Sequence, residues 1–279
     1  MWFGYSYFLP FIGGDLNYLF MFNFFSPLEQ FEIVPFINLK FYSSLLGFFD
    51  FSITNQTFVI FLVIILSIFF YSSLLSPKTY TLYTIPTRFQ VFIELLYKII
   101  LSIVISNVGK EGQIYFPLIF AIFFYILSFN LIGLIPYSFT ITSHIIVTLS
   151  LSLFFFIGIN LISIKKHGLK FFALFLPTGV TSILGLLLVP IEIISFVVKP
   201  LSLAIRLFAN MMAGHALLKI IAGFAWSLMS CNGLLFFAHL VPLIVLIPLM
   251  GLECVVAIIQ AFVFTTLCTI YLNDSLNMH

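Results

Sequence analysis

The stretch PLSLAIRLFANMMAGHALLKIIAGFAW, residues 200–226, decides the fold. It is apolar enough to lie in a bilayer, yet Arg206 stands in its middle. An arginine at the centre of a membrane helix costs about 2.5–3.5 kcal/mol of insertion free energy. Because arginine keeps its charge at any accessible pH, Arg206 is a fixed cation rather than a proton carrier. A cation kept at such a cost indicates a function. Its natural partner is a carboxylate that lies beside it only part of the time.

The composition places the whole chain in a membrane. Of its 279 residues, 62% are hydrophobic and 7% are charged, with a mean hydropathy of +1.24, whereas soluble domains carry about 25% charged residues. The net charge of +2 gives no sign of a nucleic-acid partner. We find no nucleophile constellation, phosphate loop or metal-ligand spacing, so we expect no catalytic residue, cofactor or metal. The predicted class is an all-α polytopic membrane protein.

The first half of the sequence predicts an arm followed by separate spans. Prolines and glycines interrupt residues 1–52, for which we predict an N-terminal arm with a short interfacial helix near 27–38. Residues 53–164 form the second part, because their apolar runs are long enough to cross about 30 Å of hydrocarbon. Its predicted elements are a span at 53–75, an interfacial helix at 86–108 and two upright spans at 115–135 and 141–164, joined by a turn at 136–138.

Residues 165–279 form the third part, a basic loop at 165–170 followed by two very long apolar stretches. Helices over 190–226 and 233–272 would measure about 54 and 58 Å, against a hydrocarbon core of about 30 Å. Either both helices tilt steeply or internal prolines break them into pieces. The one convincing turn, at 227–232, favours a hairpin of two long, steeply tilted membrane helices. Such a tilt needs a curved protein surface to pack on.

Basic residues set the predicted orientation. Seven of them fall on one side of the membrane in this arrangement, and the positive-inside rule assigns that side to the cytoplasm or matrix. The N-terminus then faces out and the C-terminus faces in. The seven residues are Lys78, Arg88, Lys98, Lys110, Lys165, Lys166 and Lys170.

Polar residues follow rows along the predicted hairpin. His215, nine residues beyond Arg206, points about 180° away from it. On the second helix His239, Glu253 and Gln260 are 14 and 7 residues apart, which defines one stripe. Acids and histidines on both sides of a fixed cation indicate two separate water-accessible paths for protons. The row that contains the cation consists of Glu192, Ser195, Lys199, Ser202, Arg206 and Asn210, at spacings of three and four.

Each of these residues also has a purely structural explanation, which the sequence leaves open. Arg206 could be tied to backbone carbonyls or to Glu253, and His215 with Glu253 could simply hold the hairpin together. His144 and His239 lie toward the outer interface, where a snorkelling histidine is as good an explanation as a proton relay. For Asn130 we expect helix packing rather than chemistry.

Four stretches carry a resemblance to a known family. They are LSLAIRLFANMMAGH (201–215), LECVVAIIQAFVFTTLCTIYLND (252–274), IPYSFTITSH (135–144) and SPLEQFEI (26–33). These stretches resemble subunit a of the rotary ATP synthases, most closely its mitochondrial form. The motif around Arg206 is long and specific, and the resemblance extends over nearly everything from Ser26 on.

The resemblance implies a role for each polar row. Arg206 matches the arginine that faces the ring of c subunits and attracts each ring carboxylate as it passes. Glu192 and Ser195 match the half-channel towards the matrix, with Ser202 on the same face. In bacterial members the acid and the histidine of the outer pair look interchanged, which indicates that the two side chains are neighbours in space. The residues assigned to the outer half-channel are His215, Glu253, Asn210, Gln260, His239 and His144.

The implied function is proton translocation through two offset half-channels beside the rotating c-ring, which couples proton flow to ATP synthesis. The chain would be a non-catalytic subunit of the mitochondrial inner membrane, with its N-terminus in the intermembrane space and its C-terminus in the matrix. The implied partners are c-ring subunits, the peripheral stalk, other membrane subunits including those at a dimer interface, lipids and protons.

Two other classes of function remain as alternatives. A proton-coupled, antiporter-like subunit of a respiratory complex would also bury charges, but it predicts inverted repeats, and residues 53–164 do not repeat the pattern of 190–272. A membrane scaffold subunit would not need Arg206, Glu192 and Glu253 together at membrane depth.

Overall fold

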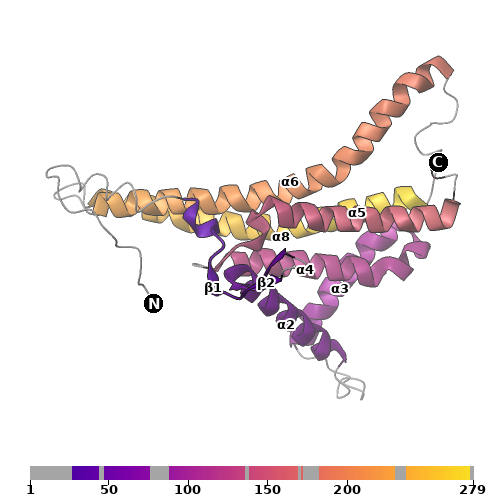
Figure 1. Cartoon of the computed structure of the whole chain (residues 1–279). Helices are drawn as coiled ribbons and strands as arrows, with labels where there is room; N and C mark the ends of the chain where they lie inside the picture. Colours follow the sequence, from indigo (N-terminus) through magenta and orange to yellow (C-terminus); the bar gives the residue numbers. More distant parts are fainter. Residues whose placement is uncertain are drawn as a thin grey trace.

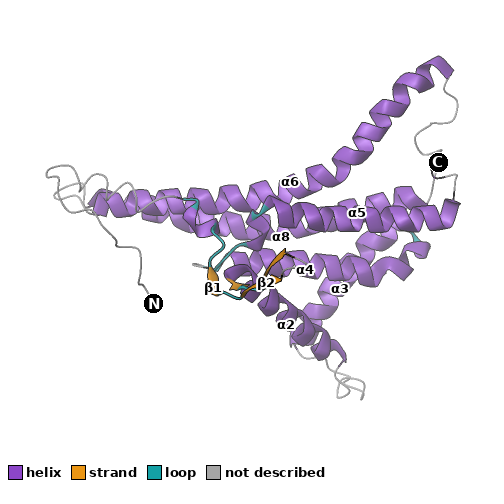
Figure 2. Cartoon of the chain, in the orientation of Figure 1, coloured by secondary structure: helices purple, strands orange, loops and turns teal. Residues whose placement is uncertain are grey.

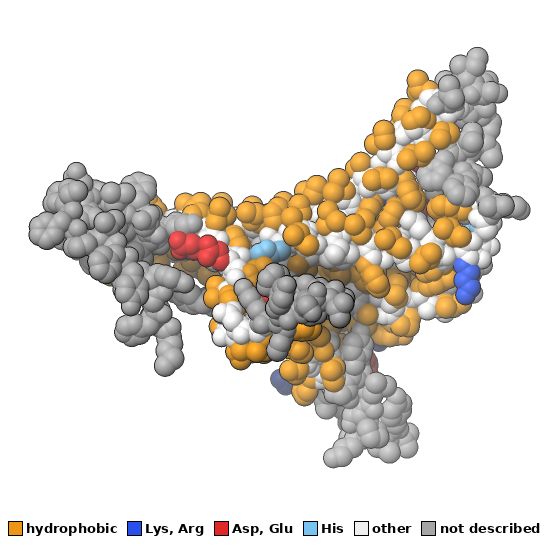
Figure 3. All heavy atoms as spheres, viewed as in Figure 1, with side chains coloured by type: hydrophobic (Ala, Val, Ile, Leu, Met, Phe, Trp, Pro, Cys, Tyr) orange, Lys and Arg blue, Asp and Glu red, His pale blue; other side chains and the backbone are white. Residues whose placement is uncertain are grey.

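The computed structural model is an assembly of long helices with a small β-structured segment at one edge (Figures 1 and 2). It describes residues 27–43, 47–75, 88–135, 138–168, 171, 182–229 and 237–276. Within these ranges, five helices are long and apolar enough to cross a membrane. Hydrophobic side chains cover most of the described surface in Figure 3. The all-α polytopic class predicted from the composition is therefore confirmed.

The predicted interfacial helix near 27–38 is wrong. A single 3-10 turn, η1 (Glu29–Phe31), is followed by four short strands. These are β1 (Pro35–Ile37), β2 (Lys40–Ser43), β3 (Gly47–Asp50) and β4 (Ile53–Thr54). Strands β2 and β3 form an antiparallel hairpin, and β1 pairs antiparallel with β4. The β-branched and aromatic residues that flank Pro35 favour a pleated backbone, and the proline lacks the N–H that a continued helix would need.

Asn55 ties this β-structured segment to the first long helix, α2 (Asn55–Leu75). Its Nδ2 donates to the Glu32 carbonyl at 3.0 Å, and its Oδ1 accepts from the Gln56 N–H at 2.9 Å. The Asn55 side chain thus holds the arm against the start of the helix. The cap is Thr54, whose Oγ1 accepts from the Thr57 N–H at 3.4 Å. The helix predicted at 53–75 is observed from Asn55 on, with residues 53–54 in β4 instead. That it crosses the membrane stays a prediction, because Asn55–Phe70 counts among the shorter apolar helices. The arm residues before 27 lie outside the described residues.

The middle of the chain forms three more long helices, joined by short 3-10 segments. The helix predicted at 141–164 is observed three to four residues later in the chain. Residues 141–143 form a 3-10 turn instead, and the helix continues through Lys165 and Lys166 in place of the predicted loop. Residues 136–137 and 169–170 lie outside the described residues. The elements are α3 (Arg88–Val108), η3 (Lys110–Tyr115), α4 (Phe116–Gly133), η4 (Ile141–Ser143) and α5 (Ile145–His167).

The last third is the long hairpin expected from the sequence. Helix α6 (Ser182–Met229) and helix α8 (Leu240–Leu276) run antiparallel, side by side (Figure 1). At 1.5 Å per residue they are about 72 and 55 Å long, far more than the hydrocarbon core. The predicted turn begins later, because α6 continues through Met229, and residues 230–236 are not among those described. A steep tilt in the membrane stays a prediction.

Internal prolines bend the hairpin without breaking it. Pro190 and Pro200 lie inside α6 and Pro248 lies inside α8. The N-terminal part of α6 turns away from α8 (Figure 1), as expected where a proline removes a backbone N–H and its ring crowds the preceding turn. The alternative of helices broken into pieces is therefore wrong.

Helix α4 forms the centre of the core. Its buried phenylalanines and isoleucines pack against α3 and α8. Asn130, fully buried among them, donates from Nδ2 to the Ala257 carbonyl of α8 at 3.3 Å. A second polar link joins Asn107 Nδ2 of α3 to Thr269 Oγ1 of α8 at 2.7 Å. The packing role expected of Asn130 is confirmed.

We expect Asn130→Ala to destabilise the chain modestly. Hydrogen bonds between membrane helices contribute about 0.6–1.7 kcal/mol, and truncation also leaves a cavity. The measurement is the thermal denaturation midpoint of the detergent-solubilised protein. Ser102→Ala is the matched control, because among the described residues the exposed Ser102 hydroxyl bonds only to a carbonyl of its own helix. Equal midpoints for the two variants would contradict the packing role.

Candidate functional site

Two polar pairs join α6 to α8 along the hairpin. Asn210 Nδ2 donates to Gln260 Oε1 at 3.0 Å, and His215 Nε2 lies 3.4 Å from Glu253 Oε1. Residue numbers rise along one helix as they fall along the other, as the antiparallel packing requires. The structure thus brings together four of the residues predicted for the outer half-channel.

The His215–Glu253 pair is enclosed by protein. Glu253 is 6% exposed and Gln260 is 3% exposed, while the His215 side chain is 14% exposed. Within the described part of the chain, no hydrogen bond reaches either Glu253 carboxylate oxygen or Gln260 Nε2. A buried carboxylate without donors is costly, so this pair is suited to taking up a proton or an ordered water.

Arg206 lies about 180° around α6 from His215, in the same row as Lys199 and Asn210. It is exposed, as are Ser202 and Ser195 on the same face, and Glu192 is half-buried. Along the helix axis, Arg206 lies about 13.5 Å from His215 and about 21 Å from Glu192. Among the described residues no carboxylate forms an ion pair with Arg206. The structural alternative in which Glu253 neutralises it is therefore not the arrangement observed.

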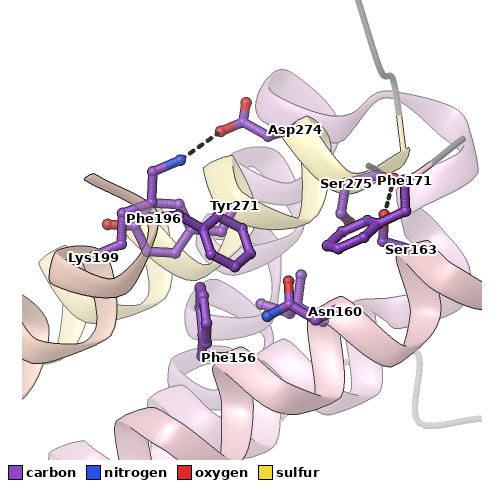
Figure 4. Close-up of a pocket in the computed structure, with 10 residues that line it drawn as sticks. Phe156, Asn160, Ser163, Phe171, Phe196, Lys199, Tyr271, Asp274 and Ser275 are labelled. Atoms are coloured by element: carbon purple, nitrogen blue, oxygen red, sulfur yellow. Dashed lines mark hydrogen bonds and ion pairs between the residues drawn. The ribbon is translucent and has the colours of Figure 1, made fainter. Parts of the chain in front are cut away.

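Lys199 has a partner that the sequence did not predict. Its Nζ lies 3.7 Å from Asp274 Oδ2 and 5.2 Å from the centre of the Tyr271 ring (Figure 4). A cavity of about 30 Å³ lies beside this pair, between α5, α6 and α8. Nearby, Ser163 of α5 donates to the Ser275 carbonyl at 3.2 Å. Lys165 and Lys166 close α5 at the same end of the molecule, called here the Lys-rich end.

The two remaining predicted histidines lie away from the buried pair. His144 precedes α5 and stacks on Phe139 with ring centres 5.2 Å apart, and its buried Nε2 has no hydrogen bond to a described residue. His239 comes immediately before α8, about 21 Å from Glu253 by helical rise. No described contact joins either histidine to His215 or Glu253.

A larger cavity connects the region of His144 with α6. It measures about 320 Å³ and is lined mainly by apolar side chains of α4 and α5. Its wall also includes Thr142, whose buried hydroxyl lacks a partner among the described residues. Leu207 of α6, next to Arg206, also lines it. The cavity thus reaches from the start of α5 to the middle of α6.

A family model described as ATP synthase A chain matches residues 56–273. The chain belongs to this family. The matched range includes every predicted site residue, from His144 to Gln260, and it ends one residue before Asp274.

Individual relatives of the chain are also subunits a of ATP synthases. ATP synthase subunit a of Chondrus crispus is 52% identical over 254 residues, which cover 91% of this chain and 97% of the relative. The subunit a of Pylaiella littoralis is 51% identical over 259 residues, covering 93% and 100%. ATP synthase subunit a-2 of Arabidopsis thaliana is 44% identical over 268 residues, covering 94% and 75%. The family resemblance of the sequence motifs is therefore confirmed over most of the chain.

Proposed function

We propose that the chain conducts protons across a membrane through two offset half-channels that open on opposite sides of Arg206, within an ATP synthase. One observation carries the proposal. Arg206 is exposed, while His215, about 180° around α6 from it, forms a buried pair with Glu253 of α8. The fixed cation and His215 are thus separated by about 180° around the helix axis and by about 13.5 Å along it. Family membership supports the same function.

The outer path uses the buried pairs of the hairpin. A proton enters past His144 and the cavity that includes Thr142, reaches Glu253 and His215, and passes Asn210 and Gln260. Both partners of the central pair can hold a proton, and the carboxylate has no competing donor among the described residues. His239 lies farther toward the same outer end of α8.

The inner path leads to the Lys-rich end. Glu192 and Ser195 lie on the same face of α6 as Arg206, with Ser202 between them and the arginine. The Lys199–Asp274 pair lies near this end of the hairpin. A proton released beside Glu192 leaves on the side opposite to the one it entered.

Arg206 separates the two paths. A ring carboxylate that has lost its proton is attracted to the guanidinium, while a proton near the same fixed charge is disfavoured. Protonated, the carboxyl group can move into lipid without carrying a charge. Each proton that crosses gains about 2.3 kcal/mol per 100 mV of membrane potential. Directional flow then rotates the ring.

The open face of the hairpin fits a c-ring as its main partner. Helix α6 exposes apolar side chains such as Val198, Leu201 and Ile205 in the part that carries Arg206, and a long tilted hairpin suits a cylindrical surface. The chain supplies no catalytic residue in this proposal, and ATP is made elsewhere in the complex. The peripheral stalk, other membrane subunits and lipids contact the remaining surfaces. The proposed location is the mitochondrial inner membrane, with the Lys-rich end in the matrix.

The test is potential-driven proton uptake into vesicles that contain the assembled complex. We expect Glu192→Gln and Glu253→Gln each to slow uptake by about tenfold or more, because each removes a proton-binding group from one path. Glu94→Gln is the control, since Glu94 on α3 is exposed and accepts only from Gln90 Nε2 at 3.3 Å among the bonds described. Unchanged uptake in both hairpin variants would contradict the proposed function.

A further inference from the structure

The Glu253 carboxylate lies against the backbone of α6 at Gly214. A Cβ atom at Gly214 would lie 2.7 Å from Glu253 Oε1, 3.1 Å from its Cδ and 3.4 Å from its Cγ. The first distance is too short for any real contact, so a methyl group there would force the carboxylate to move. The same Oε1 is the oxygen that faces His215 Nε2 at 3.4 Å.

Backbone conformation does not explain a glycine at this position. Gly214 lies inside α6, and the positive-φ glycines of the described chain are Gly109 and Gly168. A glycine weakens a helix interior relative to alanine. Gly158, also inside a long helix, would meet nothing within 4 Å if it carried a Cβ. The space above Gly214 is therefore filled by the carboxylate, whereas the space above Gly158 is open.

We infer that Gly214 is a positioning residue that lets the Glu253 carboxylate reach His215. Oε1 is the end of a flexible side chain, so an added methyl group displaces it without breaking the helix packing. Because His215 is the next residue on α6, displacement from Gly214 also changes the contact with His215. Alanine should thus leave the helix at least as stable while it disrupts the proton-binding pair.

The inference rests on the proposed function and is tested with the complete complex in vesicles. We expect Gly214→Ala to assemble normally and to slow potential-driven proton uptake by about tenfold or more, since small misplacements of reacting groups have effects of this size. Gly158→Ala, the matched control, should retain normal uptake. Normal uptake with Gly214→Ala would overturn the inference, and so would its failure to assemble.

A double-mutant cycle shows whether Gly214 acts through the carboxylate. Glu253→Asp is one methylene shorter, so its carboxylate is withdrawn from the added methyl group. We expect Gly214→Ala to cause little further loss in a Glu253→Asp background. An equal fold-loss in both backgrounds would indicate a general packing effect and overturn the inference. The proposed function fails separately, if Glu192→Gln and Glu253→Gln both leave uptake unchanged.

Discussion

Replacing Arg206 by glutamine should abolish ATP-driven proton pumping in an otherwise intact complex. Two unit charges 4 Å apart attract by about 4 kcal/mol at an effective dielectric constant of 20. Glutamine removes this attraction for a ring carboxylate and also removes the positive barrier between the two proposed paths. We therefore expect coupled pumping to fall to background. The measurement is acidification of vesicles on ATP addition, with the subunit composition of the complex confirmed.

Arg88→Gln is the control for this result. Arg88 is the exposed first residue of α3 and lies outside the hairpin, so its neutral variant should pump normally. Normal pumping by Arg206→Gln would instead show that the arginine is a structural charge. If Arg206→Gln prevented assembly of the complex, the two proposed proton paths would be tested by the Glu192→Gln and Glu253→Gln variants instead.

Exchanging His215 and Glu253 should recover part of the proton flux that each single change removes. His215→Glu places two carboxylates side by side, and Glu253→His places two imidazoles there, so neither variant keeps the pair of acid and base. The double exchange restores one of each across the 3.4 Å contact. We expect each single variant to lose about tenfold or more of potential-driven uptake, and the double variant to exceed both.

The result depends on spatial coupling between the two residues. If their effects simply multiplied, so that the exchanged variant was the least active, then the two side chains would not act as a pair. The same assay on Asn210→Leu, which breaks the neighbouring hydrogen bond to Gln260, shows whether the effect is confined to the pair.

Membrane physics made the hairpin predictable, but not the details of its ends. Two apolar stretches far longer than a bilayer is thick had to tilt or break, and only one turn separated them. Helix α6 begins at Ser182, earlier than expected, because a long membrane helix tolerates Pro190 inside it when the surrounding packing compensates. The arm near Pro35 was misjudged, because a short amphipathic segment beside a proline can form a 3-10 turn and strands as readily as a helix.

The sequence placed the polar residues of the candidate site along the two hairpin helices, but it did not place all of their contacts. Helical spacing alone placed Glu253 and Gln260 on one stripe, and the family resemblance was needed to set His215 beside Glu253. The same spacing grouped His239 with them, although His239 lies just before the first residue of α8. Gly214 carries no sequence signal, because its importance comes from a side chain 39 positions away. The Lys199–Asp274 contact is missed for the same reason.

The measurement that tests the central claim most directly is the side from which water reaches each proposed path. Single cysteines would replace Ser195 and Asn210 in a chain whose own cysteines have been removed. Each variant would be treated, in the assembled complex, with a small membrane-impermeant thiol reagent from one side at a time. We predict that the cysteine at 195 reacts only from the Lys-rich side and the cysteine at 210 only from the opposite side. Reaction of both from the same side would contradict two offset half-channels separated by Arg206.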